Sequence, residues 1–266
     1  MAVKQVYLLE GGYLYLDQSI LTWGRGYGQE QKIPVYMVLL ESDKGWILID
    51  TGLNPQGVLE PEKTWGERAK VVRPELKPQD DVRLRLEKLG LNVNDIKYVI
   101  QTHLHWDHTG GNRFLTEATF FVQKAEYRFA YWPDQYVQAS YMRDHFHCGV
   151  QYETVEGDVE ILPGITLLYT PGHTPGHQSV LVKLTNGRYL LFTGDAAYTL
   201  DNLKEMLPPG NSWDPLAAVA SLQKLKTIQA LTGAFLLPSH DLKFWAGVPK
   251  SPASLVGWLG EKEEAK

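Results

Sequence analysis

The 266-residue sequence has a single cysteine, Cys148. One thiol cannot form a disulfide within the chain, which excludes the disulfide-stabilised class and is typical of a reducing compartment. No stretch approaches 18 consecutive apolar residues, so we expect no transmembrane helix. The opening residues, MAVKQVYLLEGG, lack a basic segment followed by a long apolar one. We therefore expect no secretory signal there and a cytoplasmic protein.

Runs of lysine and arginine are also missing, and the formal net charge is −5. A chain without a basic stripe is a poor partner for nucleic acid, and without an apolar span it is not expected in a membrane. Apolar residues make up 44% and charged residues 21%, as in ordinary globular proteins. Linkers, low-complexity segments and short repeats are absent, so we expect one domain over residues 1–266.

The sequence is rich, by contrast, in metal-ligand side chains within THLHWDHTGG, residues 102–111. Three histidines and an aspartate fall within six residues: His103, His105, Asp107 and His108. They follow the β-prone run 98–100, so the group begins where a buried strand ends. Imidazole and carboxylate groups are the ligands that zinc and similar divalent metals prefer. Four of them cannot all reach one ion, and the spacing suits two adjacent ions.

Three later residues of ligand type each follow a predicted strand: His173, Asp195 and His240. Turns after strands at one sheet edge can bring such side chains together. Asp50 follows a strand too, and it either orients a ligand or closes a turn. His177 is expected to orient ligands or to be structural, and the group His145, His147 and Cys148 lacks a strand before it, so no metal site is predicted there.

Alternating apolar residues and turn signals predict a mixed α/β fold. Hairpins are expected in three places: 6–9 with 14–16 around Gly11-Gly12, 35–40 with 46–50, and 179–184 with 188–193 around Asn186-Gly187. Helices are expected over 80–90, ended by Gly90, and after Asp214 and Pro215. Further strands are expected at 120–122, 165–169 and 234–237.

The H-x-H-x-D-H pattern after a strand resembles that of the metallo-β-lactamase superfamily. More of the chain is similar to its N-acyl-homoserine lactonase branch, because ILIDTG, GDVEILPGITLLYTPGHTPGHQS, GDAAYT and PSHD occur in the same order. The resemblance runs from about Val3 to about His240. It implies an α/β (α+β) fold, a four-layer αββα sandwich with the metals held by loops at one edge of two sheets, and it favours a homodimer.

The resemblance also implies a site with two divalent metal ions, zinc first and cobalt, iron or manganese as alternatives. It assigns His103, His105 and His173 to the first ion. It assigns Asp107, His108 and His240 to the second, with Asp195 between the two. Asp50 matches a position that orients ligands.

Two ions that share a water lower its pKa, and the resulting hydroxide can attack an ester, thioester, amide or phosphoester. No Gly-x-Ser-x-Gly nucleophile is present. Tyr198 can reach the developing oxyanion, and Asp107 can carry a proton to the leaving oxygen. The expected substrates are N-acyl-homoserine lactones, whose opening is quorum quenching. Trp23, Trp106 and Tyr198 are the expected substrate-binding residues.

Other functions are less well supported by the residues. Hydrolysis of another lactone, a thioester or a phosphotriester would use the same fold, but a glutathione thioesterase is expected to carry a basic C-terminal patch. Here only Lys243 and Lys250 stand near that end of the core. Redox proteins of the same fold typically have glutamate where this chain has His105. A metal sensor would predict an incomplete ligand set, and a structural zinc finger would need cysteine pairs.

Overall fold

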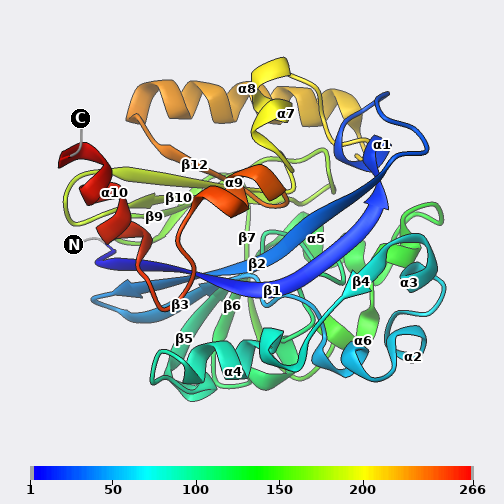
Figure 1. The fold of residues 1–266 in the computed structure, drawn as a ribbon, viewed down its shortest axis with the longest axis horizontal. Helices are drawn as coiled ribbons and strands as arrows, with labels where there is room; N and C mark the ends of the chain where they lie inside the picture. The colour runs from blue at the N-terminus through cyan, green and yellow to red at the C-terminus, as the bar shows by residue number, and fades with distance from the viewer. Residues whose placement is uncertain (1–2, 265–266) are drawn as a thin grey trace.

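The computed structural model describes residues 3–264 and contains two β-sheets (Figure 1). The larger sheet has seven strands in the order β4 (Arg73–Glu75), β1 (Gln5–Asp17), β2 (Glu30–Ser42), β3 (Gly45–Ile49), β5 (Ile96–Ile100), β6 (Thr119–Gln123) and β7 (Gln151–Val155). The smaller sheet has five, in the order β12 (Phe235–Pro238), β11 (Tyr189–Gly194), β10 (Gln178–Lys183), β9 (Ile165–Tyr169) and β8 (Val159–Leu162).

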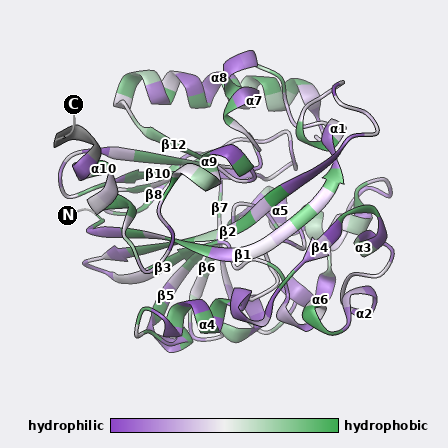
Figure 2. Ribbon diagram, in the orientation of Figure 1, coloured by the Kyte–Doolittle hydropathy of each residue, from purple (hydrophilic) through white to green (hydrophobic). Residues whose placement is uncertain are grey.

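Helices connect and cover the strands. The longest is α8 (Pro215–Thr232); the others are α1 (Gln18–Leu21), α2 (Pro61–Trp65), α3 (Arg68–Val71), α4 (Val82–Glu87), α5 (Lys124–Tyr131), α6 (Arg143–Phe146), α7 (Leu200–Glu205), α9 (Leu242–Gly247) and α10 (Leu255–Glu264). In Figure 1, α8 and α7 lie over the smaller sheet and α4 lies against the outer side of the larger one. Along α8, hydrophobic and hydrophilic residues are interleaved, as in a helix with one buried face (Figure 2).

Side-chain alternation divides the core into layers. In β2, Val38 and Leu40 belong to the cluster between the two sheets, whereas Met37 and Leu39 belong to the cluster that also contains Leu86 of α4. A third cluster joins the smaller sheet to α8. Because successive residues of a strand point to opposite faces, both faces of these strands are buried. The four-layer αββα arrangement expected from the resemblance is confirmed.

Strand direction brings five loops to one edge of the sandwich. β3 and β5 are parallel in the larger sheet. In the smaller sheet β11 and β12 are parallel, and β9 runs in the same direction because both β9 and β11 are antiparallel to β10. The residues after these strands include every metal-ligand candidate that the sequence singles out.

The expected hairpin around Gly11-Gly12 is wrong. Residues 5–17 form one strand that pairs with β2 along both halves, with a register shift between Glu10 and Tyr13. The glycines form a β-bulge instead of a turn, because the backbones of two neighbouring segments of the chain pass very close to them. A Cβ on Gly11 would stand 3.1 Å from the Val35 carbonyl oxygen, and one on Gly12 would stand 2.9 Å from that of Glu75.

The other local predictions agree with the structure, with shifts at the ends. β10 and β11 pair through the Asn186-Gly187 turn, and β2 and β3 form the second hairpin. The Asp214 side chain accepts hydrogen bonds from the N–H groups of Leu216 and Ala217, so it caps α8 as expected. The helix expected over 80–90 is shorter, spanning Val82–Glu87. Within residues 3–264 we find no helix with the length and apolarity to cross a membrane.

Candidate metal centre

Every residue of the histidine-bearing segment 102–111 is buried, and backbone contacts hold the segment in place. The Thr51 N–H donates to the His108 carbonyl (2.8 Å), and the Gly110 N–H donates to the Gly52 carbonyl (2.8 Å). A Cβ at Gly110 would lie 2.0 Å from the backbone nitrogen of Asn54. Glycine is required there because the loop after β3 is pressed against the histidine loop.

The folded chain brings all seven predicted metal ligands together. Their ligand atoms form three groups, each with distances within 4.8 Å: His103, His105 and His173; His103, His108 and Asp195; Asp107, His108 and His240. The first and third groups are the two sets that the resemblance assigns to separate ions. Each of these sets takes two ligands from the loop after β5 and one from the smaller sheet.

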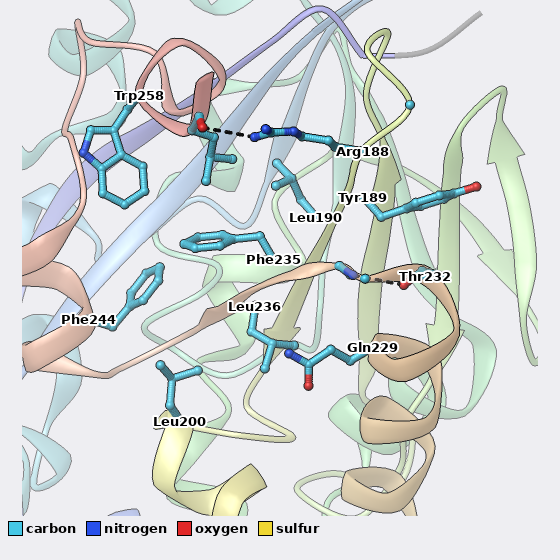
Figure 3. A pocket seen from close by; sticks show the side chains of 14 residues that line it. Arg188, Tyr189, Leu190, Leu200, Gln229, Thr232, Phe235, Leu236, Phe244 and Trp258 are labelled. Atoms are coloured by element: carbon cyan, nitrogen blue, oxygen red, sulfur yellow. Dashed lines mark hydrogen bonds between the residues drawn. The ribbon is translucent and has the colours of Figure 1, made fainter. Parts of the chain in front are cut away.

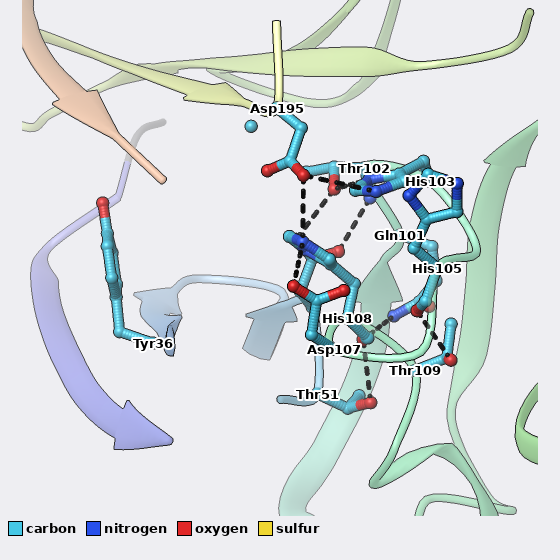
Figure 4. A network of polar contacts seen from close by, with 12 residues as sticks. Tyr36, Thr51, Gln101, Thr102, His103, His105, Asp107, His108, Thr109 and Asp195 are labelled. Atoms are coloured by element: carbon cyan, nitrogen blue, oxygen red, sulfur yellow. Dashed lines mark hydrogen bonds and ion pairs between the residues drawn. The ribbon is translucent and has the colours of Figure 1, made fainter. Parts of the chain in front are cut away.

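Asp195 lies beside ligands of both sets, and Figure 4 shows it near His103 and His108. Its Oδ2 is 3.3 Å from His173 Nε2, 3.5 Å from His103 Nε2 and 3.4 Å from His108 Nε2. Its Oδ1 is 3.2 Å from His240 Nε2. A carboxylate with imidazole nitrogens on both sides has the position of a bridging ligand.

The donor set fits divalent metals because four of its buried atoms make no hydrogen bond. The Nε2 atoms of His103, His105 and His108 and Oδ1 of Asp195 are buried without a hydrogen bond. Burying such groups unpaired is unfavourable, so these atoms are suited to a ligand that the protein does not supply. The chemistry also fits, because imidazole and carboxylate together suit zinc and its first-row neighbours.

Electrostatics favour positive charge in the same place. Burial lowers the pKa of His173 to about 4, and burial also holds the pKa of His103 and His105 well below 6.5, so these rings are neutral, as ligands must be. His108 differs: burial acts to lower its pKa, but Asp195, Asp107 and Asp50 raise it well above 6.5. The negative charge of these carboxylates, which favours the protonated form of His108, would also stabilise a bound metal cation.

Asp50 orients the loop from behind. Its carboxylate accepts hydrogen bonds from the Thr102 N–H (2.8 Å) and the Thr102 hydroxyl (2.8 Å), and it lies 2.8 Å from His108 Nδ1. That contact leaves His108 Nε2 directed at Asp195. Asp50 has a φ of +57°, an unfavourable conformation for a residue other than glycine. Such strain at a site is retained where surrounding contacts fix it.

His177 takes no place in any of the three groups. Its Nε2 accepts a hydrogen bond from the Asp195 N–H (2.8 Å), while its Nδ1 contacts the Thr170 carbonyl (3.1 Å). Burial lowers its pKa to about 3, so the ring is neutral with its proton on Nδ1. His177 therefore fixes the backbone of Asp195, in line with the orienting role expected of it.

Tyr198 and Trp106 line a narrow cavity, about 20 Å³ in volume, beside His105, Asp107, Asp195 and His240. Burial and the charges of Asp195 and Asp107 hold the pKa of Tyr198 well above 10, so its phenol keeps its proton. Asn211 contacts the phenol oxygen through Nδ2 at 2.9 Å. Trp23 is elsewhere: its side chain is 47% exposed, and it is not among the residues that line this cavity.

Two residues at the site escaped sequence reasoning. Arg68 lines the same cavity, and its Nε is buried without a hydrogen-bond partner. Glu126 is fully buried and accepts hydrogen bonds from Leu104 and Thr174. Arg68 lies in a polar stretch without periodicity and Glu126 in a short helix, so neither shows a local signal. Only the fold brings them to the site.

The histidines near Cys148 are placed differently from the metal ligands. His145 Nε2 contacts the Asn54 side chain (3.1 Å), and His147 Nδ1 contacts the Tyr131 hydroxyl (2.9 Å). The Cys148 thiol donates to the His145 carbonyl. None of the three belongs to a metal-ligand group within residues 3–264.

A larger cavity, about 710 Å³ in volume, lies at the other end of β11 and β12 (Figure 3). Leu190, Phe235, Phe244 and Trp258 are among its lining residues. None of the residues of the metal-ligand groups lines it, so cavity size alone does not identify the candidate metal centre. The chemistry lies in the narrow cavity at the ends of the strands.

Known proteins resemble the chain over most of its length. The model of the metallo-beta-lactamase superfamily matches residues 32–240. The chain is 35% identical to the N-acyl homoserine lactonase AttM of Azorhizobium caulinodans over 255 residues, which cover 93% of this chain and 97% of AttM. It is 33% identical to the N-acyl homoserine lactonase AiiA of Bacillus thuringiensis subsp. kurstaki over 248 residues, 91% of this chain and 95% of AiiA.

Solved structures agree. An N-acyl homoserine lactone hydrolase with N-hexanoyl-L-homoserine bound at its catalytic metal centre superposes with a TM-score of 0.87 at 32% identity. That alignment covers 96% of this chain and 100% of the other. At 18% identity, the dizinc lactonase AidC shares the fold with a TM-score of 0.67 over 95% of this chain and 96% of AidC.

Proposed function

The chain belongs to the metallo-β-lactamase superfamily and, within it, to the N-acyl homoserine lactonases; from this we propose that it opens the lactone ring of N-acyl-homoserine lactones, a quorum-quenching reaction. The observation that carries the proposal is the convergence of seven ligand residues, Asp195 among them, beside a protonated tyrosine. The enzyme is a metal-dependent hydrolase with two metal ions.

The residues would divide the work as follows. His103, His105 and His173 would hold one ion, Asp107, His108 and His240 would hold the other, and Asp195 would be shared by the two sets. Two such ions, when bound, supply Lewis acidity and an activated water. Asp107 lines the cavity and carries the proton to the leaving alcohol oxygen, so that ring opening yields the N-acyl-homoserine carboxylate and no second product.

Tyr198 stabilises the developing oxyanion by hydrogen bonding. Its raised pKa keeps the phenol a donor near neutral pH, and Asn211 holds the phenol in place. Trp106 forms part of the wall that the acyl-homoserine group contacts, and its burial against Trp65 (ring centroids 5.2 Å apart) keeps it fixed. That Trp23 contacts the substrate stays a prediction, because its side chain is largely exposed and does not line this cavity.

A hydrolysis panel tests the reaction. The metal-loaded protein and a chelated control are given acyl-homoserine lactones of short and long tail, a plain γ-lactone, a glutathione thioester and a β-lactam, with products read by mass spectrometry. Chelator-sensitive opening of the acyl-homoserine lactones is expected. A clear preference for another substrate would contradict the lactonase assignment but would not contradict the metal centre.

Replacing Tyr198 with phenylalanine is expected to lower kcat by about 100-fold, the typical effect of losing one oxyanion donor. The metal content should stay unchanged, because the histidines and aspartates of the metal-ligand groups are all kept. Steady-state kinetics and elemental analysis measure the two quantities. Tyr189→Phe is the matched control, since Tyr189 lines the distant cavity. Unchanged turnover in the Tyr198 variant would remove its role.

Arg68→Met is expected to raise KM about 10-fold with a smaller change in kcat. The Arg68 guanidinium lines the cavity with a buried, unpaired Nε, and a hydrogen bond to a charged group contributes about 1.5–3 kcal/mol. We assign it to an oxygen of the bound substrate. Arg128→Met, at an exposed position of α5, is the control. An unchanged KM would show that Arg68 does not contact the substrate.

We also propose that the protein is a cytoplasmic homodimer. Large side chains are exposed over adjoining segments: Trp132 (82%), Tyr136 (68%) and Leu216 (83%). The Tyr136 hydroxyl donates to the Trp213 carbonyl (3.2 Å), which joins the two segments. Exposed aromatic groups are enriched at interfaces. Light scattering of the purified protein measures the oligomeric state, and cell fractionation measures the location.

A further inference from the structure

Glu126 is a buried carboxylate whose two oxygens are both fully used. It lies near the start of α5 with no exposed surface. Its Oε1 accepts hydrogen bonds from the Leu104 N–H (2.9 Å) and the Tyr141 hydroxyl (3.2 Å). Its Oε2 accepts from the Thr174 hydroxyl (2.5 Å) and the Gly176 N–H (3.3 Å). Burying a carboxylate is unfavourable unless it is paired in this way.

Three of the four donors belong to the segments that carry the first set of ligands. Leu104 lies between His103 and His105, and Thr174 directly follows His173. The Tyr141 ring also packs edge-on against His105, with centroids 4.7 Å apart. One side chain therefore joins two loops that are distant in the sequence and that supply one metal set.

The loop carrying His173 packs closely against the backbone of Glu126. A Cβ on Gly176 would lie 1.9 Å from the Glu126 backbone nitrogen, so the loop rests directly on the first turn of α5. Without the carboxylate, the Gly176 and Leu104 N–H groups would be buried unpaired. Leaving a buried donor unsatisfied costs about 1–3 kcal/mol, so the loops are expected to shift when Glu126 is lost.

The second set is supported by other groups. His108 Nδ1 contacts Asp50, and His240 Nδ1 donates to the Pro34 carbonyl (2.8 Å). No hydrogen bond of Glu126 reaches Asp107, His108 or His240 within residues 3–264. Asp50 also holds Thr102, beside His103, so it supports both sets, whereas the hydrogen bonds of Glu126 go to the first set's side of the site alone.

We propose that Glu126 is a positioning residue for one of the two ions: it keeps His103, His105 and His173 converged, and the other ion does not depend on it. The proposal rests on the two-metal centre of the proposed function. Losing Glu126 weakens one metal-binding step and leaves the other near its original affinity.

The test uses the full-length Glu126→Gln variant. Glutamine has the same size, but its amide nitrogen cannot accept a hydrogen bond, so at least one N–H or hydroxyl loses its acceptor. Protein loaded with two ions is dialysed against increasing chelator, and bound metal is measured by elemental analysis. Wild-type protein is expected to keep both ions over a range in which the variant keeps one, with the lost ion bound about 10–100-fold more weakly.

Cobalt spectroscopy identifies which ion is lost. The cobalt-loaded wild type is expected to show the absorption of two ligand environments and the variant that of one. Tyr141→Phe, which removes one hydrogen bond and keeps the ring against His105, is expected to weaken the same ion by a smaller factor. This milder variant also keeps the proposal testable if Glu126→Gln folds poorly.

Asp80→Asn is the matched control. Asp80 is also a buried carboxylate, and it accepts hydrogen bonds from Arg85 (2.7 Å) and the Lys77 N–H (2.8 Å), which lie outside the metal-ligand segments. It should retain both ions at wild-type affinity. Release of both ions together from Glu126→Gln, or retention of both as in wild type, would overturn the proposal. Failure of the wild type to bind two ions would instead overturn the proposed function.

Discussion

Replacing Asp195 with alanine is expected to lower lactone hydrolysis by about 10³-fold or more, at the upper end of the effect of removing one electrostatic group from a catalytic site. Its carboxylate lies within 3.5 Å of nitrogens from both metal-ligand sets, so no other residue can take its position. Metal content should fall below two ions per chain. Steady-state kinetics and elemental analysis measure both effects.

Asp201→Ala separates this effect from the loss of a negative charge. Asp201 is an exposed aspartate in the first turn of α7, six residues after Asp195 in the sequence. Its removal should leave kinetics and metal content as they are. If Asp195→Ala kept both ions and substantial turnover, the carboxylate would not be the link between the two sets.

Gly110→Ala is expected to be the most damaging small substitution in the histidine loop. A Cβ there would stand 2.0 Å from the Asn54 nitrogen and 2.2 Å from the Leu53 carbonyl carbon, both of them backbone atoms that cannot swing aside. Overpacking of this kind typically costs about 1–3 kcal/mol and sometimes more. We expect about 3 kcal/mol of lost stability, measured by urea unfolding, together with weaker metal binding.

Gly247→Ala provides the comparison. Gly247 ends α9, and a Cβ there would meet nothing within 4 Å. Because alanine is favoured over glycine in helices by up to about 1 kcal/mol, this variant should be as stable as wild type or slightly more so. Equal stability of the two variants would show that the two loops can separate without cost.

Sequence reasoning works well here where chemistry and turns are local. The histidine loop has four ligand candidates within six residues, and each remaining candidate follows a strand. The candidate metal ligands can therefore be identified from the sequence. Asn186-Gly187 and Asp214-Pro215 likewise determine their turn and helix start through local conformational preference. The layered fold followed from the resemblance, since strand patterns alone do not determine topology.

What escaped prediction depends on contacts between distant segments. Gly11-Gly12 looks like a turn, but the long partner strand β2 and the nearby β4 make it a bulge. Glu126 acquires its role only when loops about 20 and 50 residues away in the sequence meet its carboxylate. Trp23 stays a prediction as a substrate contact, and its 47% exposure could not be inferred from its aromatic character.

Each metal set draws on both sheets, and this arrangement links metal supply to the amount of folded protein. Neither sheet by itself presents a complete set, so the ions bind only after the two halves of the sandwich have come together. A ligand that binds only the folded state adds about 4 kcal/mol to stability at 1,000 times its dissociation constant. A cell short of these metals would therefore contain less of this protein, as well as a less active one, because unfolded chains are removed by proteolysis.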